Sequence, residues 1–535
     1  MDTELPDTPP WLALLAGLGL WFVVAAPGAS LGDPPEGLGV VGEVGVVLLW
    51  AAAGWRRTAA AAWLALFVFQ LVRLSSLVGM GEEGLLVDLL WLAGHVWVLA
   101  ADWIGVLRWP LLALLLASIG LSGLLVSRLL SATSDHPKVL AGLGVVLIGL
   151  ALVPPVPGGW LTPVLVDNVA ASTALWTEDQ KLLAEAAVHP APYPAGPDAP
   201  DVHVYIVESY GALLLRDPSL SLAHETLLGE LQERVTAAGW ASASGLSAAP
   251  VSGGRSWIAD AAVLLGTPVA HETSYRRVMD EVDDLPHLPA WFEAAGYRTL
   301  LCRPKDRARP GVHLENPLRF ERTVFYADLA YEGPHHGWGW VPDQYTLGWL
   351  RDEVLPEEPD RPTFLFAHLV TAHIPWRTPP PIVEDWRDLG APDETLEAIV
   401  EDRSALDELA FHLHRFRRGQ QGLGADLRSY MRQGDPAEKY RHAVGYDLEV
   451  LTLHLEALDS DHPTVVVWMG DHAPPGIAAR HSFAVPVHVI ATDPSLLKPF
   501  LSRGFRRGLL PGAATNLGHE DLYEPLTELV PPAVP

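Results

Sequence analysis

Residues 464–475, with the sequence TVVVWMGDHAPP, constrain the fold more than any other stretch of this chain. The unbroken apolar run from Val465 to Met469 favours a strand buried on both faces, as in the parallel sheet of an α/β domain. Asp471 and His472 follow at the carboxyl end of that predicted strand. Open α/β sheets bind ligands at this edge, and an aspartate beside a histidine offers an oxygen and a nitrogen to a divalent metal. Because an isolated pair of this kind is more often a simple turn, matching residues must come from other parts of the chain.

The composition indicates that part of the chain lies in a membrane. Of the 535 residues, 49% are hydrophobic, and the mean hydropathy of +0.19 is high for a purely soluble protein. The net charge of −28 argues against a nucleic-acid partner, which needs a basic face. Cys302 is the only cysteine, so no disulfide can form within the chain.

The first third of the chain supplies the predicted membrane domain, residues 1–157. Six apolar segments there approach or exceed the length that a bilayer core requires. They cover residues 11–26, 38–55, 59–80, 85–107, 110–130 and 139–153.

The charged loops favour five spans rather than six. Arg56 and Arg57 follow the second segment, and Arg128 and Lys138 flank the link between the fifth and the sixth. Both basic loops lie in the cytoplasm only if segment 85–107 does not cross the bilayer. We therefore predict five spans plus one tilted or re-entrant helix.

Segment 85–107 is also unusual in its polar residues. Asp88, His95 and Asp102 recur every seven residues and share one helical face, which is costly in a lipid-facing span. The five-span arrangement places everything after residue 153 outside the cytoplasm. We thus predict a multi-pass protein of the cytoplasmic membrane with its catalytic domain on the extracytoplasmic side. Six ordinary spans, with the polar stripe inside the bundle, are the alternative.

The rest of the chain reads as a connector, one α/β domain and a tail. Residues 158–200 contain a juxtamembrane helix and a Pro-rich linker, residues 201–510 form the predicted domain, and residues 511–535 form a C-terminal tail. Apolar strands are predicted at 202–207, 297–302, 363–369, 464–469 and 486–491, with helices between them. This alternation predicts a mostly parallel central sheet flanked by helices.

Two further motifs offer side chains that could bind the same metal as Asp471 and His472. Glu208 directly follows the first predicted strand, and Ser256 follows two glycines and begins a helix that runs to about residue 265. Together these residues predict a metal site with carboxylate oxygens, one imidazole and a serine hydroxyl. A divalent cation lowers the pKa of bound water from about 16 to about 7, and the same effect would make the Ser256 hydroxyl a nucleophile for phosphoesters.

The order of these motifs resembles the sulfatase-like branch of the alkaline phosphatase superfamily. The motifs begin with Glu208 at the end of a predicted strand and Ser256 at the start of a predicted helix. They continue with TAHIPW at 371–376, GDH at 470–472 and His481. With a multi-span domain in front, the chain is most similar to lipoteichoic acid synthases and to the related phosphoethanolamine and phosphoglycerol transferases.

The resemblance implies one divalent metal ion (Mn, Mg or Zn) and a set of site residues. The implied metal ligands are Glu208, Ser256, Asp471 and His472, with Ser256 as the catalytic nucleophile. His373 and His481 would contact the substrate phosphate or protonate the leaving group. The implied substrate-binding residues are Arg303, Arg307, Trp340, Asp343 and Trp376.

The resemblance also implies a function. A membrane lipid would donate a phosphoglycerol or phosphoethanolamine head group, and a cell-envelope polymer or glycan would accept it, through a phosphoseryl intermediate. A phosphodiesterase or phosphatase of the same fold, or a non-catalytic membrane sensor, is the alternative. Residues 256–260, SWIAD, lack the proline and arginine of the sulfatase formylglycine motif, so sulfatase activity is not expected.

Overall fold

The computed structural model of the 535-residue chain forms two compact units. The first unit contains residues 1–78 and 83–174, and the second contains residues 79–82 and 175–535. The structure describes residues 41–80, 84–88, 108–132, 137–151, 162–186, 189–308, 314–334, 336, 340–374, 376, 378–391, 435–458, 462–477 and 482–533.

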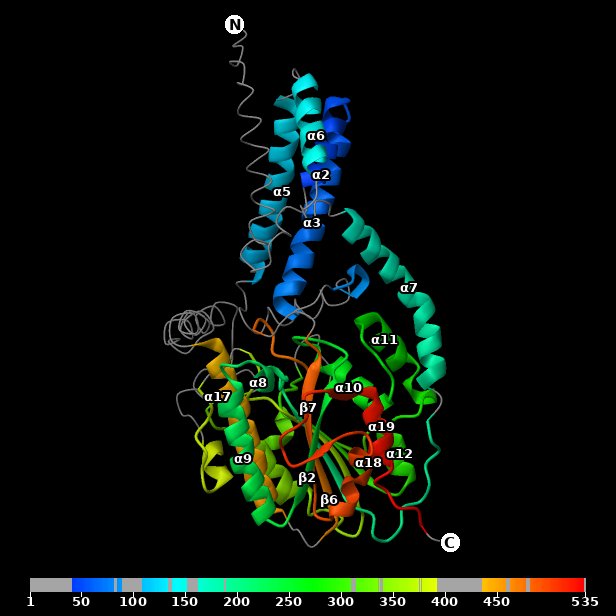
Figure 1. The fold of residues 1–535 in the computed structure, drawn as a ribbon, viewed down its shortest axis with the longest axis vertical. Helices are drawn as coiled ribbons and strands as arrows, with labels where there is room; N and C mark the ends of the chain where they lie inside the picture. The colour runs from blue at the N-terminus through cyan, green and yellow to red at the C-terminus, as the bar shows by residue number, and fades with distance from the viewer. Residues whose placement is uncertain are drawn as a thin grey trace. The chain divides into compact units, whose positions relative to one another are not determined.

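The described part of the first unit is helical (Figure 1). Gly45 and Gly144 let helices α2 and α6 pack closely, since a Cβ on Gly45 would lie 2.7 Å from the Gly144 carbonyl oxygen. We find no helix in the described ranges whose length and apolar character suit a membrane crossing. The helices are α2 (Val41–Ala52), α3 (Arg56–Met80), α5 (Arg108–Ala132), α6 (Pro137–Ala151) and α7 (Thr162–Ala186), of which α7 continues into the second unit.

Part of the predicted membrane domain lies outside the described residues. This applies to the segment at 11–26 and to residues 89–107, which carry His95 and Asp102. The five-span arrangement therefore stays a prediction.

The second unit is an α/β domain built on one sheet with strand order β4-β3-β5-β1-β6-β7-β2-β8, and β9 pairs with β2. Strands β1, β3, β5, β6 and β7 fall where the apolar runs predict them. The strands are β1 (Asp201–Val207), β2 (Ala241–Ala248), β3 (Arg298–Arg303), β4 (Arg322–Phe325), β5 (Thr363–Leu369), β6 (Thr464–Gly470), β7 (Ala484–Ala491), β8 (Arg506–Arg507) and β9 (Thr515–Gly518).

The sheet is mixed, so the prediction of a mostly parallel sheet is wrong. Strands β4, β3, β5, β1 and β6 are mutually parallel, but β7 runs antiparallel to both β6 and β2. A parallel connection needs a crossover, usually through a helix, whereas β6 reaches β7 through residues 471–483, in whose described part no helix occurs. An apolar run reports burial on both faces but not the direction of the strand.

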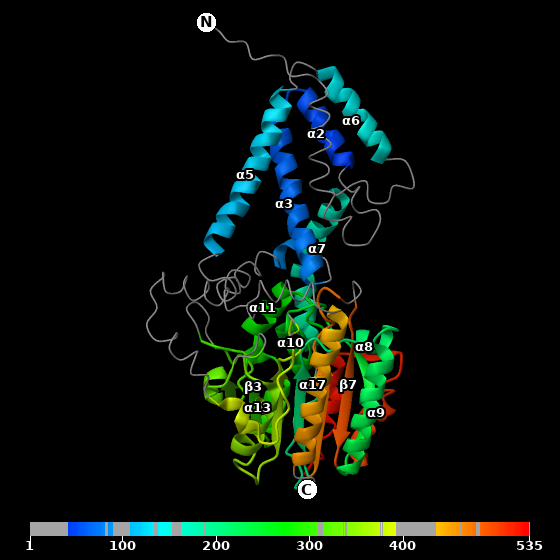
Figure 2. The ribbon, with the colours of Figure 1, turned by 90° about the vertical axis from the view of Figure 1, so that its left-hand side faces the viewer.

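Helices cover both faces of the sheet, as predicted, and the structure has one hydrophobic core on each face. Alternate residues of β1 point to opposite faces: Val204 joins the core under α10, α12 and α19, and Tyr205 joins the core under α9, α13 and α17. Figure 1 shows α9 and α17 on one side of the strands and α10, α12, α18 and α19 on the other, and Figure 2 shows α9 and α17 in front. The remaining helices of this unit are α8 (Leu213–Arg216), α9 (Ser221–Ala237), α10 (Ser256–Leu265), α11 (Glu272–Asp280), α12 (Leu288–Ala294), α13 (Asp343–Trp349), α17 (Pro436–Ala457), α18 (Lys498–Leu501) and α19 (Tyr523–Thr527).

Residues 511–535, which the sequence suggested as a tail, contribute to this fold. Strand β9 pairs with β2, and α19 contacts α10 and α12. Leu522, Tyr523 and Leu526 are buried in the first of the two cores. The domain therefore extends at least to α19.

Gly470, the last residue of β6, tests how tightly the sheet edge is packed. A Cβ on Gly470 would lie 2.0 Å from the Tyr210 carbonyl oxygen, so backbone would have to move. We expect Gly470→Ala to lower the free energy of unfolding by about 3 kcal/mol or more in denaturant titrations. Gly229→Ala on α9 is the control, because a Cβ there meets nothing within 4 Å, and it should stabilise the protein by about 0.5–1 kcal/mol. Equal effects of the two substitutions would contradict this account of the packing.

Candidate metal centre and active site

The carboxyl ends of five strands bring the candidate residues to one edge of the sheet. Glu208 follows β1, Asp471 follows β6, and β1 and β6 are neighbouring parallel strands. His373 follows β5 on the other side of β1, and Lys305 follows β3. Strand β2 points the same way as β6 because β7 is antiparallel to both, so the loop from β2 to Ser256 starts at this edge too.

Strand register places Glu208 beside Asp471 and His472. Val207 is paired with Gly470, so the next residues of the two strands leave the sheet side by side. Ligand atoms of Glu208, Asp471 and His472 all lie within 4.8 Å of one another, and the three side chains are buried. The structure thus confirms the proximity of three predicted ligands, which come from two distant parts of the chain.

The Nε2 atom of His472 lies at the centre of this cluster. It is 3.3 Å from Asp471 Oδ2, 3.4 Å from Glu208 Oε1 and 3.5 Å from Ser256 Oγ. The other ring nitrogen, Nδ1, donates a hydrogen bond to the Ala473 carbonyl at 2.9 Å. In the neutral ring, Nε2 therefore carries its lone pair toward the oxygens, which is the orientation of a metal-binding histidine.

The donor set fits a divalent cation. Asp471 Oδ1 accepts hydrogen bonds from the backbone N–H groups of Ser209 and His472, whereas its buried Oδ2 has no hydrogen-bond donor among the described residues. Burial raises the pKa of Asp471, and the charge of Glu208 raises it further. A cation between the two carboxylates would satisfy Oδ2 and offset this repulsion. Two carboxylates and one imidazole suit Mn, Mg or Zn without a strong preference.

Lys305, which belongs to the cationic run Arg303, Lys305, Arg307 and Arg309 in the sequence, is a cationic partner of the cluster. Its Nζ donates to Glu208 Oε2 at 3.2 Å. Burial alone would raise the pKa of Glu208, but Lys305, and then His373 and His472, lower it below its usual range. Glu208 is therefore ionised and ready to bind a cation at neutral pH.

Ser256 is the first residue of α10, as predicted, and its side chain is buried. The preceding Arg255 adopts the left-handed conformation with φ of 65°, which turns the chain sharply into the helix. Ser209, next to Glu208, has φ of 59°. Both reactive turns of the site thus depend on backbone conformations that side-chain-bearing residues rarely adopt.

His373 lies within electrostatic reach of Glu208, Lys305 and His472, so the structure brings it to the cluster. Its Nδ1 donates to the Ile374 carbonyl, which leaves Nε2 with the lone pair in the neutral ring. Burial lowers the pKa of His373, partly opposed by Glu208, and the ring is neutral at neutral pH. His481, the other predicted histidine, lies outside the described residues.

Arg303 and Arg307 point to different partners. Arg303 Nη2 lies 3.1 Å from Asp260 Oδ2 on α10. The guanidinium of Arg307 stacks on the ring of Trp340, 3.4 Å from the ring centre. Their role in substrate binding stays a prediction, and so does that of Trp340. Arg309, the last residue of the cationic run, lies outside the described residues, as do Trp338 and Gly339, which precede Trp340.

Asp343 and Trp376 hold the loop that carries His373. The two carboxylate oxygens of Asp343 accept hydrogen bonds from the backbone N–H groups of Val370 and Thr371 at 2.8 and 2.7 Å. Trp376 is buried, and its indole donates to the Ala372 carbonyl at 2.7 Å. Both residues fix the start of this loop, whatever further contact they make with a substrate.

A second buried carboxyl, Asp447 on α17, faces Asp343. Burial raises the pKa of Asp447 strongly, and the charge of Asp343 raises it further. Between the usual aspartate pKa of about 4 and this raised value, the folded protein holds a proton that the unfolded chain has released. The free energy of unfolding therefore falls as pH rises through this window, by up to about 1.4 kcal/mol per pH unit for this group.

Replacing the Asp447 carboxyl with an amide removes this titration. We expect Asp447→Asn to become increasingly more stable than the original protein as pH rises above about 4. Thermal unfolding over a pH series measures the difference. Asp280→Asn on the exposed end of α11 removes the same charge and should show no such trend. A pH-independent difference for Asp447→Asn would contradict the raised pKa of Asp447.

Three other residues near the site were missed by sequence reasoning. Asp260 is one helical turn after Ser256, and the helical period could have revealed it. His368 Nε2 lies 3.0 Å from Asp260 Oδ2, but an apolar strand gave no signal for it. His519 follows the short strand β9, and its Nδ1 pairs with Ser247 Oγ at 2.9 Å. Burial lowers the pKa of His519 to about 4.

Similarity to known proteins is found among solved structures. No protein-family model and no curated protein sequence matches the chain. Solved structures do match. The integral membrane protein lipooligosaccharide phosphoethanolamine transferase A from Neisseria meningitidis is 14% identical, with a TM-score of 0.43, over 97% of this chain and 94% of that chain. The lipoteichoic acid synthase LtaP from Listeria monocytogenes is 14% identical, with a TM-score of 0.38, over 64% and 76%. The phosphoglycerol transferase GacH from Streptococcus pyogenes is 13% identical, with a TM-score of 0.33, over 60% and 74%.

Proposed function

We propose that this chain is a membrane-anchored, metal-dependent phosphotransferase that moves a phospholipid head group to an extracytoplasmic acceptor. The observation that carries the proposal is the Ser256 hydroxyl, 3.5 Å from the lone-pair nitrogen of His472 in a buried cluster with two carboxylates. Such a cluster is suited to hold a cation beside an alcohol. An alcohol beside a cation can attack a phosphoester.

The proposed first half-reaction forms a phosphoseryl intermediate. Ser256 Oγ attacks phosphorus, a new Oγ–P bond forms, and the P–O bond to diacylglycerol breaks. The proton of Ser256 passes to the neutral His373 and from there to the departing oxygen. Glu208, Asp471 and His472 would hold a divalent ion, which when bound would lower the pKa of the serine hydroxyl and offset the negative charge of the phosphoryl oxygens. Lys305 adds a second positive charge at the cluster.

The second half-reaction reverses these roles. A hydroxyl of a cell-envelope polymer or glycan attacks the same phosphorus, its proton passes to His373, and the Oγ–P bond breaks. His373 then returns the proton to Ser256. Anchoring the site at a bilayer surface raises the effective concentration of a lipid donor, whereas a soluble substrate gains nothing from it.

Mass spectrometry of the Ser256 peptide tests the proposal. The full-length protein in phospholipid vesicles should gain the mass of a phospho-head group on Ser256 within one turnover, and diacylglycerol should appear in equal amount. If only soluble phosphoesters modify Ser256 and no diacylglycerol forms, the lipid donor is wrong and a hydrolase of the same chemistry takes its place.

A further inference from the structure

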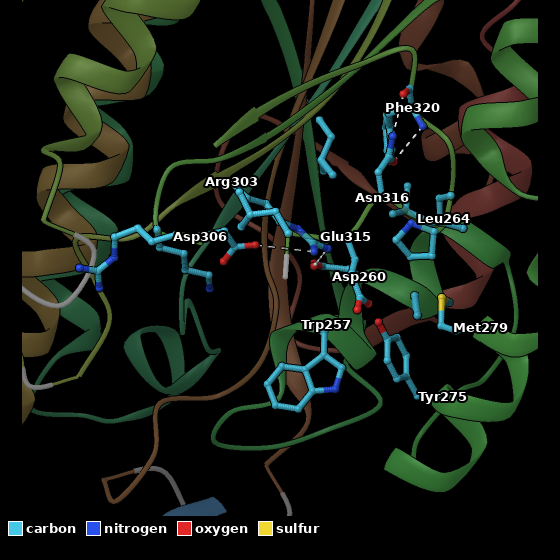
Figure 3. A pocket seen from close by; sticks show the side chains of 17 residues that line it. Trp257, Asp260, Leu264, Tyr275, Met279, Arg303, Asp306, Glu315, Asn316 and Phe320 are labelled. Atoms are coloured by element: carbon cyan, nitrogen blue, oxygen red, sulfur yellow. Dashed lines mark hydrogen bonds and ion pairs between the residues drawn. The ribbon is translucent and has the colours of Figure 1, made fainter. Parts of the chain in front are cut away.

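The turn that follows β1, residues 208–211, carries the metal-cluster residue Glu208 but belongs to no helix or strand. A cavity of about 210 Å³ next to the cluster runs along α10, where Asp260, Arg303 and Lys305 line it (Figure 3). None of the turn residues is among the described residues that line this cavity. Contacts with the rest of the protein, rather than with a molecule in the cavity, therefore set the conformation of the turn.

The hydroxyl of Tyr440 on α17 forms two hydrogen bonds with this turn. It donates to the Ser209 carbonyl at 2.8 Å and accepts from the Gly211 backbone N–H at 2.9 Å. A hydroxyl has one proton to donate and oxygen lone pairs to accept with, so both bonds can form at once. Tyr440 is fully buried, so solvent does not compete for them. The hydroxyl thus closes the turn around Ser209, whose φ of 59° is left-handed.

The backbone of Ser209 connects the Tyr440 hydroxyl to two metal-cluster residues. Its N–H donates to Asp471 Oδ1 at 2.7 Å, and Glu208 is the residue directly before it. A residue with a side chain favours other backbone conformations over the left-handed one, so Ser209 would tend to rotate without the bond to Tyr440. Such a rotation would turn the Ser209 N–H away from Asp471 and shift Glu208. The two carboxylates would then no longer face the same point.

Helix α17 holds the Tyr440 hydroxyl in place. The side chains of Val444 and Leu448 on the same helix are buried in the core on that face of the sheet. The Tyr440 ring packs against Trp376 of the loop that carries His373, with ring centres 5.2 Å apart. Helix α17 therefore contacts two parts of the active site and can fix one relative to the other.

We propose that Tyr440 is a positioning residue of the metal centre, whose hydroxyl fixes the turn at Ser209 so that Glu208 and Asp471 bind one cation. The proposal rests on the proposed metal-dependent function, because it assigns a role toward the same ion. In this role Tyr440 binds neither the ion nor the substrate, and it acts through the backbone of the turn.

Tyr440→Phe tests the proposal, because it removes the hydroxyl and keeps the ring against Trp376. In detergent micelles, the full-length variant should bind manganese about tenfold more weakly than the original protein, which is the lower end of the effect of residues that support metal ligands. Isothermal titration calorimetry measures the dissociation constant of manganese without requiring turnover. Unchanged manganese binding in the folded variant would overturn the proposal.

Tyr205→Phe is the matched control. Tyr205 lies on β1 and is fully buried, and its hydroxyl pairs with His454 of α17 at 2.8 Å. This variant therefore also removes one hydroxyl contact between the same strand and the same helix, and thermal unfolding of both variants measures the stability that each loses. Tyr205→Phe should bind manganese like the original protein. Equal weakening of manganese binding in the two variants would overturn the proposal, since the effect would then come from a general loosening of the fold.

Hydrogen exchange of the original protein tests the same link if Tyr440→Phe does not fold. Because coupling between two sites is reciprocal, bound manganese should slow deuterium exchange at the Gly211 amide, which donates to the Tyr440 hydroxyl. Exchange that is the same with and without manganese would overturn the role of Tyr440 and leave the metal-dependent function intact. If the original protein binds no manganese, the metal-dependent function fails, and the proposal fails with it.

Discussion

Replacing Asp471 with alanine is expected to remove the bound divalent ion and to reduce phosphotransfer on the order of 10³-fold or more. Asp471 supplies the buried Oδ2 that has no other donor in the described structure, and it also orders the Ser209 and His472 backbone through Oδ1. Glu208→Ala and His472→Ala should have the same effect, because each removes one donor from a small set. Elemental analysis of the purified variants measures the metal directly.

A substitution outside the metal cluster serves as the control. His442→Ala removes an exposed imidazole on α17 and should retain both metal and activity. If all three ligand variants lose activity but keep their full content of bound metal, the assignment of the metal centre is wrong.

Replacing Ser256 with alanine is expected to abolish the covalent intermediate while leaving the metal in place. Ser256 contributes only a neutral hydroxyl, whereas both carboxylates and the imidazole remain in this variant, so the ion should be retained. Without the hydroxyl there is no nucleophile, and the rate should fall on the order of 10³-fold or more. The fall in rate with normal metal content distinguishes this variant from the ligand variants.

Ser256→Thr is the matched control, because threonine keeps the hydroxyl and adds one methyl group. It should form the adduct at a measurable rate, which rapid quenching and mass spectrometry of the peptide would show. A Ser256→Ala protein that transfers head groups as fast as the original would mean that another residue, or water, attacks phosphorus.

The sequence predicted strands β1, β3, β5, β6 and β7, but it did not predict the remaining strands or the antiparallel direction of β7. The runs that became β1, β5 and β6 are apolar throughout, and burial on both faces follows from that pattern. Strand β2, with the sequence ASASGLSA, is small and polar and gave no strand signal, yet it is buried between β7 and β8. Its burial depends on tertiary packing, which local propensity does not contain.

The metal cluster was predictable because its residues stand at strand ends. Once β1 and β6 are neighbours, the register brings Glu208 and Asp471 together without further information. His368 and Asp260 were harder to predict, because their contacts depend on how α10 packs against the ends of β3 and β5. No periodicity in the sequence reports which helix covers which strand.

The left-handed turns at Ser209 and Arg255 lower the stability of the fold but position catalytic residues. Each backbone conformation costs roughly 1–2 kcal/mol for a residue with a side chain, and glycine would relieve that cost. A screen for variants with higher folding stability would therefore select glycine at 209 and 255. Glycine there also loosens the chain beside Glu208 and Ser256, whose placement the chemistry depends on. The two turns therefore lower the folding stability of the protein in exchange for a rigid backbone beside Glu208 and Ser256.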